Sequence, residues 1–344
     1  MKIGNKFGVH RVITPNGVLP QAAQKIDNTM EIYNNEILID VITLNIDSAS
    51  FTQLKESSNK DKEKMKEKIL SIVNERGKMQ NPVTGSGGML IGIVKKIGPE
   101  FPDKHLKVGD KIATLVSLTL TPLKIDKIID IKLDTDQVDV KAEAVLFASG
   151  IYSILPQDLP EKLALAALDV AGAPAQVNKL VKKGNSVAII GAAGKSGVLC
   201  CYQAMKKVGP NGRVIAVVRS EKRRQELLEL GYVTDIVIAD ATNAVDVYEG
   251  VLQANNGKQV DVTINVVNIT NTEMSSILIT KDSGVVYFFS MATSFTKAAL
   301  GAEGIGTDVT MLIGNGYSKN HDKITLNILR ESGKIRKIFE KKYL

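Results

Sequence analysis

Three glycines at positions 191, 194 and 197 form the most informative chemical motif of this sequence. They lie in the run GAAGKSG, between the apolar segment 187–190 and a segment of helical character. Glycine suits such a turn because the backbone must approach a pyrophosphate closely and the helix must pack tightly on the strand. A turn without a ligand could use the same glycines, but a second strand about twenty residues further on completes the dinucleotide pattern. The residues expected to bind the phosphates are Gly191, Ala193, Gly194, Lys195, Ser196 and Gly197.

The residues after that second strand indicate which dinucleotide is accepted. Folds selective for NAD usually place an acidic residue there, whereas this chain reads VVRSEKR at 217–223. Arg219, together with Ser220 and with Lys222 or Arg223, could bind a 2′-phosphate. Alternatively, Lys222 and Arg223 only face solvent on the following helix. We therefore expect NAD or NADP as cofactor.

The segments around the turn alternate between strand and helix. The expected strands are 186–190, 214–218, 235–238, 261–267 and 284–290, with a last edge strand at 309–314. The expected helices are 163–180, 196–208 and 221–230, with a closing amphipathic helix from residue 322. This alternation predicts parallel βαβ units in a doubly wound α/β sheet.

The chain before residue 160 has a different pattern. Residues 36–44 indicate a half-buried strand, residues 85–98 a glycine-rich turn entering another strand, and short strands continue to about residue 156. A charged helical insert at 53–78 has only one narrow apolar face. The expected domains are a β-rich catalytic domain at 1–160, a dinucleotide-binding domain at 161–318 and a helical tail at 319–344.

Composition excludes several classes of protein. Of 344 residues, 44% are hydrophobic and 24% charged, and the net charge of +7 comes from lysines and arginines interspersed with acids. This distribution argues against nucleic-acid binding. The chain has neither a long apolar stretch nor an apolar signal core, so we expect a cytoplasmic protein without a membrane partner. Cys200 and Cys201 are adjacent and unsuited to a mutual disulfide, and three widely spaced histidines offer no metal site.

Several runs carry a resemblance to a known superfamily. GIVKKIG at 92–98, VGDKI at 108–112 and LDVAGAPA at 168–175 are similar to segments of the medium-chain dehydrogenase/reductase superfamily. The resemblance implies an N-terminal β-rich GroES-like domain followed by a Rossmann domain. Where zinc-dependent members carry their metal ligands, this chain has Ile46 or its neighbours, Gly87–Met89 and Val170, and the resemblance gives none of these as a zinc ligand. The resemblance therefore implies an enzyme without a metal.

Three longer runs narrow the resemblance. Residues 78–92, 113–126 and 290–306 resemble those of the L-erythro-3,5-diaminohexanoate dehydrogenase family of anaerobic lysine fermentation. That resemblance implies NAD(P)-dependent oxidative deamination of 3,5-diaminohexanoate at C3, which gives 5-amino-3-oxohexanoate and ammonium.

Amine oxidation needs a base, counter-charges for the substrate and a positioned water. Asp47 follows the vacated position Ile46 and is the favoured general base, while Asp169 or Glu303 could pair with a substrate ammonium. Asp47 could instead be a helix or turn cap, and Asp169 could only bond to backbone. Hydroxyls expected to contact substrate or water are Thr84, Ser86, Ser117 and Thr119. Lys78 or Lys297 could bind the carboxylate, and Ser290 and Met291 would lie near the nicotinamide.

Two other functions use the same architecture. A zinc-free quinone or enoyl reductase would reduce an activated alkene with NADPH. A non-enzymatic member would bind NADPH without turnover. The edge strand at 309–314 predicts a homodimer, because an unpaired strand edge is a template for pairing.

Overall fold

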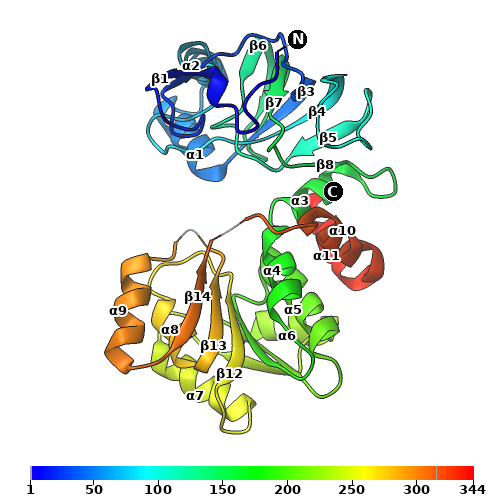
Figure 1. Ribbon diagram of the computed structural model, residues 1–344. Helices are drawn as coiled ribbons and strands as arrows, with labels where there is room; N and C mark the ends of the chain where they lie inside the picture. The colour runs from blue at the N-terminus through cyan, green and yellow to red at the C-terminus, as the bar shows by residue number, and fades with distance from the viewer. Residues whose placement is uncertain (1, 291, 315) are drawn as a thin grey trace. The chain divides into compact units, whose positions relative to one another are not determined.

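The computed structural model describes residues 2–290, 292–314 and 316–344. The chain divides into two compact units, Met1–Asp158 and Leu159–Leu344 (Figure 1). None of the helices in the part of the chain that the structure describes is long and apolar enough to cross a membrane. The two units carry different sheets, one antiparallel and one parallel.

The first unit is built on a six-stranded antiparallel sheet in the order β6-β7-β3-β4-β5-β8. Its strands are β3 (Ile37–Ile46), β4 (Gly88–Ile97), β5 (Lys111–Thr114), β6 (Leu123–Lys132), β7 (Gln137–Leu146) and β8 (Tyr152–Ile154). β6 and β7 have ten residues each, so the expectation of short strands between residue 98 and about residue 156 is wrong for these two. In β6 charged residues surround Ile128 and Ile131, which are buried. Because half of the strand is charged, its sequence does not show the apolar pattern of a strand. A separate ribbon pairs β1 (Val12–Thr14) with β2 (Lys25–Ile26).

The helical insert consists of two helices, α1 (Ser48–Ser57) and α2 (Lys62–Arg76), rather than one segment. The chain breaks between them because Asn59 and Lys60 adopt positive φ angles of 52° and 61°. Asp61 then caps α2 by accepting hydrogen bonds from the amides of Glu63 and Lys64. The expected apolar face is present, since Met65, Ile69 and Val73 are completely buried in the core of the β-rich unit.

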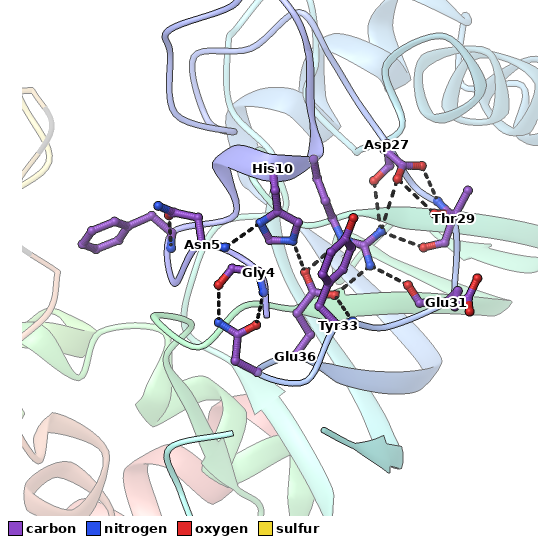
Figure 2. A network of polar contacts seen from close by, with 11 residues as sticks. Gly4, Asn5, His10, Asp27, Thr29, Glu31, Tyr33 and Glu36 are labelled. Carbon is purple, nitrogen blue, oxygen red and sulfur yellow. Dashed lines mark hydrogen bonds and ion pairs between the residues drawn. The ribbon is translucent and has the colours of Figure 1, made fainter. Parts of the chain in front are cut away.

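A buried ion-pair network holds the N-terminal segment to the start of β3 (Figure 2). Glu36 is 1% exposed and accepts hydrogen bonds from Arg11 Nη2 at 2.7 Å and from Arg11 Nε at 2.9 Å. His10 Nε2 lies 2.9 Å from the same carboxylate, and the amide of Tyr33 donates to it at 2.9 Å. Burial alone would raise the pKa of Glu36, but these donors outweigh it and lower the pKa to about 2.

The second unit contains a six-stranded parallel sheet in the order β11-β10-β9-β12-β13-β14. The strands are β9 (Ser186–Ile190), β10 (Arg213–Val218), β11 (Asp235–Ile238), β12 (Val260–Asn265), β13 (Thr280–Phe288) and β14 (Val309–Ile313). The inner strand β9 is an unbroken apolar run from Val187 to Ile190, all completely buried, as expected of a strand covered on both faces. The strand order reverses between β9 and β12, which is the switch point of a doubly wound sheet.

The helices of this unit differ from expectation in two ways: two expected helices are each divided, and three further helices are present. The alanine-rich stretch forms two helices, α3 (Glu161–Leu168) and α4 (Gly172–Leu180), and the closing segment also forms two, α10 (His321–Glu331) and α11 (Gly333–Tyr343). The second break occurs at Ser332, whose side chain caps α11 through the amide of Ile335. The expected α5 (Lys195–Val208) and α6 (Glu221–Leu230) are present, and three helices that we did not predict complete the layers: α7 (Ala244–Ala254), α8 (Glu273–Leu278) and α9 (Phe295–Ile305).

Candidate active site and cofactor site

The glycine turn connects β9 to α5 at the switch point of the parallel sheet. Gly191 has a φ of 86°, and a Cβ there would come within 3.0 Å of the Val267 amide nitrogen. A Cβ on Gly197 would come within 2.3 Å of the Gly191 carbonyl oxygen, so the helix can approach the strand only without a side chain. The turn therefore has the steric requirements of a phosphate-binding loop.

The N-terminus of α5 is open to an anion. Gly194 occupies its N-cap position, and no side chain of the described residues forms a capping bond there. The first residues of the helix are Lys195 and Ser196, both half-buried. Free amides, the positive end of the helix dipole and a lysine at one point favour a bound pyrophosphate.

Asp169 lies at the C-terminal end of α3 and forms an ion pair with Lys195 of the glycine turn. The two side chains are partly exposed, 49% for Asp169 and 25% for Lys195. Lys195 Nζ also lies 5.8 Å from the centre of the Tyr343 ring in α11. The carboxylate expected to pair with a substrate ammonium thus already has a lysine partner beside the phosphate-binding turn.

The end of β10 carries the residues expected to choose the dinucleotide. Arg219 is exposed, and Ser220 is the N-cap residue of α6 but makes no capping bond with its side chain. Hydrogen bonds from Thr242, together with the charge of Arg219, hold the pKa of Asp240 below its usual range. The charge of Arg219 therefore stabilises the ionised Asp240, which follows β11.

The segment after β13 begins at the same sheet edge as the glycine turn. Ser290 Oγ donates to Asn268 Oδ1 at 3.1 Å, whereas Met291 lies outside the described residues. Lys297, in the first turn of α9, is exposed and its ammonium contacts Asn271. Glu303 is exposed in the last turn of α9, which returns the chain to the start of β14. Because a crossover helix ends at the opposite edge of the sheet, Glu303 lies away from the glycine turn, and its expected place near the reacting amine is wrong.

Asp47 occupies the end of β3 in the β-rich unit and caps α1. Its Oδ1 atom accepts hydrogen bonds from the Ser50 amide at 3.1 Å and from Ser86 Oγ at 2.9 Å. Its Oδ2 atom is buried and has no hydrogen-bond partner among the described residues. Oδ1 therefore caps the helix, and Oδ2 is left available for a chemical role. Buried polar atoms normally have a hydrogen-bond partner, so Oδ2 is expected to bind a ligand or a water molecule.

Three hydroxyl groups extend from Asp47. Ser86 Oγ lies 2.7 Å from Ser50 Oγ, and Ser50 Oγ lies 2.6 Å from Thr84 Oγ1. Ser50 is completely buried and Thr84 is exposed, so the chain of hydroxyls connects the carboxylate with solvent. Ser50 was missed in the sequence, although its position three residues after an N-cap aspartate is a usable signal.

The loop that carries Thr119 packs against the same turn. A Cβ on Gly87 would come within 3.0 Å of the Thr119 amide nitrogen, and the Leu118 amide donates to the Gly88 carbonyl at 2.8 Å. Thr119 is 2% exposed, and its hydroxyl has no partner among the described residues. Ser117 Oγ accepts a hydrogen bond from the Thr119 amide at 3.2 Å. Thr84, Ser86, Ser117 and Thr119 thus belong to two segments that meet at the Gly87–Gly88 turn.

Lys78 does not offer a cation to a substrate. Its side chain is completely buried, and Nζ donates to the carbonyl oxygens of Pro20 at 2.6 Å and Gln21 at 3.2 Å. Burial, with the nearby charge of Arg76, lowers the pKa of Lys78 to about 8. The expected carboxylate-binding role is wrong because the amine already serves to hold the segment around Gln21.

The positions where related enzymes ligate zinc do not fit a metal in this chain. Ile46 is completely buried in the core, Gly88 has no side chain, and Val170 is a buried aliphatic residue. Across residues 2–290, 292–314 and 316–344 there is no group of three histidine, cysteine or acidic side chains that could hold a metal ion.

The parallel sheet with its glycine turn, preceded by the β-rich unit, defines a medium-chain dehydrogenase fold and an oxidoreductase. Residues 197–315 match the zinc-binding dehydrogenase family, and residues 10–156 match the L-erythro-3,5-diaminohexanoate dehydrogenase N-terminal domain. L-erythro-3,5-diaminohexanoate dehydrogenase of Acetoanaerobium sticklandii is 65% identical over 342 residues, 99% of each chain. The enzyme of the same name from Fusobacterium nucleatum is 64% identical over the full length of both. The chain belongs to the L-erythro-3,5-diaminohexanoate dehydrogenase family.

Solved structures share the fold at low sequence identity. A quinone oxidoreductase of Pseudomonas syringae pv. tomato is 18% identical with a TM-score of 0.56, covering 92% of this chain and 86% of its own. The CurK enoyl reductase is 15% identical with a TM-score of 0.54, covering 96% and 85%. A mycobacterial protein in complex with NADPH is 15% identical with a TM-score of 0.55, covering 91% and 86%.

Proposed function

We propose that this protein catalyses the NAD(P)-dependent oxidative deamination of L-erythro-3,5-diaminohexanoate at C3, a step of lysine fermentation. The products are 5-amino-3-oxohexanoate and ammonium. The names of its two relatives and the glycine turn support this proposal. The observation that carries the chemistry is Asp47, a half-buried carboxylate with one oxygen held in place and the other oxygen buried without a partner among the described residues.

In the proposed reaction Asp47 acts as the general base. The C3 ammonium gives one proton to Asp47 Oδ2, and the neutral amine then loses hydride from C3 to become an iminium. NAD(P), when bound, supplies the hydride acceptor. Water adds to the iminium carbon, the C–N bond breaks, and the ketone and ammonium leave; the proton on Asp47 is the one released to solvent. The balance is substrate ammonium, NAD(P)⁺ and water giving ketone, ammonium, NAD(P)H and one proton.

The hydroxyl groups have two roles in this proposal. Ser86 and the Ser50 amide hold Asp47 Oδ1, and the mutual hydrogen bonds of Ser86, Ser50 and Thr84 keep Ser86 in place for this contact. Thr119, whose buried hydroxyl is unpartnered, would bind the substrate amine or the attacking water. Ser117 positions the Thr119 segment through the Thr119 amide.

The cofactor and the carboxylate would be bound by the parallel-sheet unit. The pyrophosphate would be held by Gly191, Ala193, Gly194, Lys195, Ser196 and Gly197. Ser290 lies at the same edge of the sheet and would be near the nicotinamide. Both NAD and NADP serve as acceptors, because Arg219 and Ser220 stand where an acid would otherwise select NAD. Lys297 is the remaining candidate for the substrate carboxylate, and Asp169 keeps Lys195 oriented at the turn.

A homodimer through β14 and a cytoplasmic location complete the proposal. β14 is an edge of the parallel sheet, and its Thr310 and Ile313 are exposed. Pairing two β14 strands would continue the sheet and cover these edges. Cys200 and Cys201 are free and buried, which suits a reducing compartment.

The test compares substrates on the purified full-length protein. Reduction of NAD and NADP is followed at fixed enzyme concentration with 3,5-diaminohexanoate, simple amino acids and alcohols, and oxidation of NADPH is followed with quinones and crotonyl thioesters. We expect turnover with the diamine and release of one ammonium per reduced cofactor. NADPH-dependent reduction of alkenes or quinones without diamine oxidation would contradict the proposal.

A further inference from the structure

A groove of about 590 Å³ lies within the parallel-sheet unit, beside the glycine turn. Residues of α6 and of α11 line the groove, together with Ala193, Gly194 and Lys195 of the glycine turn. Helix α11 belongs to the C-terminal helical pair, which packs on α3 (Figure 1). The groove therefore joins the last helix of the chain to the phosphate-binding turn.

The lining of the groove combines an apolar floor with a cationic rim. The apolar residues are Val198, Leu227, Leu230, Ile338 and Phe339. Six cations line the groove against only two carboxylates, Glu226 and Glu229; the cations are Lys195, Arg223, Lys334, Lys337, Lys341 and Lys342. This excess of positive charge over an apolar floor suits an anion attached to a flat or apolar body.

The two ends of the groove are not equivalent. At one end Lys334 Nζ is engaged, because it donates to the carbonyl oxygens of Glu229 at 2.9 Å and Leu230 at 3.2 Å, the last carbonyls of α6. At the other end α11 finishes with Lys341, Lys342 and Tyr343, and Tyr343 lies beside Lys195. Lys195 is itself paired with Asp169, so Lys341 and Lys342, which precede Tyr343, are the lysines of α11 that this end of the groove offers to an anion.

Arg223, rather than Arg219, belongs to this groove. Arg223 lies in the first turn of α6 and lines the cavity, where its guanidinium pairs with Glu226 at 2.7 Å. Arg219 is not part of the lining, and its charge acts on Asp240 after β11. A phosphate bound in the groove would therefore meet Arg223 and the α11 lysines, and it would compete with Glu226 for Arg223.

We propose that α11 completes the cofactor site: Lys341 and Lys342, with Arg223, bind the 2′-phosphate of NADP and are the specificity-determining residues for the phosphorylated cofactor. This inference rests on the proposed function in so far as it assumes a nicotinamide dinucleotide on the glycine turn. The adenosine 2′-phosphate is the one anion that distinguishes the two cofactors, and it lies one ribose away from the pyrophosphate. Three cations around a phosphate dianion form charge-assisted contacts, each stronger than a neutral hydrogen bond.

The experiment uses nucleotide fragments that carry no nicotinamide. Binding of adenosine 2′,5′-bisphosphate and of 5′-AMP is measured by calorimetry on the full-length protein, on a Lys341→Ala/Lys342→Ala variant and on Arg219→Ala. Lys323→Ala in α10 is the matched control, because Lys323 is exposed and does not line the groove. We expect the double variant to bind the bisphosphate about tenfold more weakly and 5′-AMP within about twofold of wild type. Glu226→Gln should bind the bisphosphate more tightly, because it releases Arg223.

Three results would overturn the inference. The first is equal weakening of both nucleotides by the lysine variant, which would indicate a general electrostatic effect. The second is loss of the bisphosphate preference in Arg219→Ala with no change in the lysine variant. Binding of the nucleotide fragments does not depend on turnover. If the protein does not oxidise the diamine, that result therefore contradicts the proposed function but not this inference. Absent preference for the bisphosphate in the wild-type protein contradicts this inference alone.

Discussion

Ser86 Oγ lies 2.9 Å from Asp47 Oδ1, and the second oxygen of the same carboxylate is buried with no partner in the part of the chain that the structure describes. The hydrogen bond fixes the orientation of the carboxylate without using both oxygens. Ser50 adds its amide to the held oxygen, because Asp47 is also the N-cap of α1. A carboxylate that is oriented from one side and unsatisfied on the other is arranged to accept a proton.

Replacing Asp47 with asparagine should abolish this proton transfer. We expect kcat with the diamine to fall by a factor of about 10² to 10⁴, the usual contribution of a general base. Asparagine is as good an N-cap as aspartate, so the thermal midpoint should change little. Steady-state kinetics and thermal unfolding on the same preparation check both points, and turnover within about threefold of wild type would refute the assignment of the base.

Asp61 provides the matched control for this substitution. It caps α2 in the same unit by accepting two amide hydrogen bonds, but it is exposed and forms no hydrogen bond with Ser50, Thr84 or Ser86. Asp61→Asn should retain wild-type turnover. A similar loss in both variants would assign the effect to helix capping instead of to proton transfer.

Thr119→Val separates function from stability at the second unpartnered atom. Replacing a buried hydroxyl that has no partner with a methyl group of similar size should leave the free energy of unfolding unchanged or raise it slightly. If the hydroxyl binds the substrate amine or the water, kcat/KM should fall about tenfold or more. Denaturant unfolding and kinetics measured together decide the role, since a loss of stability with unchanged kcat/KM would make Thr119 a packing residue.

Gly197→Ala should damage cofactor binding through sterics alone. The added Cβ would come within 2.4 Å of two carbonyl oxygens of the turn, those of Gly191 and Ala192, so the backbone must shift. We expect NAD to bind at least about tenfold more weakly and the protein to lose about 1–3 kcal/mol of stability. Gly304→Ala in α9 is the control, because a Cβ there meets nothing within 4 Å and should stabilise the helix slightly. Unchanged NAD affinity in Gly197→Ala would argue against a dinucleotide on this turn.

The Glu36 network predicts a pH-dependent contribution to stability. The pKa of Glu36 is about 2 in the folded protein and 4.5 without the network, so its stabilisation is complete above about pH 4.5 and is lost as the pH falls toward 2. The contribution is about 3 kcal/mol at neutral pH. Urea unfolding should therefore show Glu36→Gln destabilised by about that amount at pH 7 and by less than half of it at pH 3.

Glu63→Gln is the control for the network, because Glu63 forms only an exposed pair with Lys66 in α2. Such pairs contribute about 0–1 kcal/mol, so this variant should match wild type at both pH values. A difference between wild type and Glu36→Gln that stays constant from pH 7 to pH 3 would contradict the ionised network.

Much of the parallel sheet could be predicted from local sequence. β9, α6 and β11 have the expected bounds, because buried parallel strands are continuous apolar runs and α6 is bounded by Ser220 and Gly231. The double helices were missed because apolar spacing continues across their breaks. The break after α10 depends on Ser332 capping the next helix, a local bond that competes with helix continuation. α9 was hidden because its exposed face carries Phe295, Leu300 and Ile305, which give no amphipathic pattern.

The candidate site was less predictable because its roles depend on distant segments. Asp47 and Ser86 are far apart in sequence and meet only because β3 pairs with β4. Lys78 could not be excluded beforehand, since a lysine in a loop gives no sign that two backbone carbonyls will bury it. Glu303 was misplaced because α9 was not predicted, and the direction of that helix decides at which sheet edge the residue lies.

The exposed edge at β14 gives the last prediction. A pairing of two β14 strands would bring Thr310 and Ile313 of both copies to the shared edge, and added lysines there would repel each other and oppose pairing. We expect a dimer for the wild type by light scattering at micromolar concentration and a monomer for Thr310→Lys/Ile313→Lys. Ile238→Lys is the matched control, because Ile238 is 46% exposed in β11, the other edge of the same sheet. A wild-type monomer, or dissociation by the β11 substitution with no effect of the β14 pair, would show that β14 is not the pairing edge.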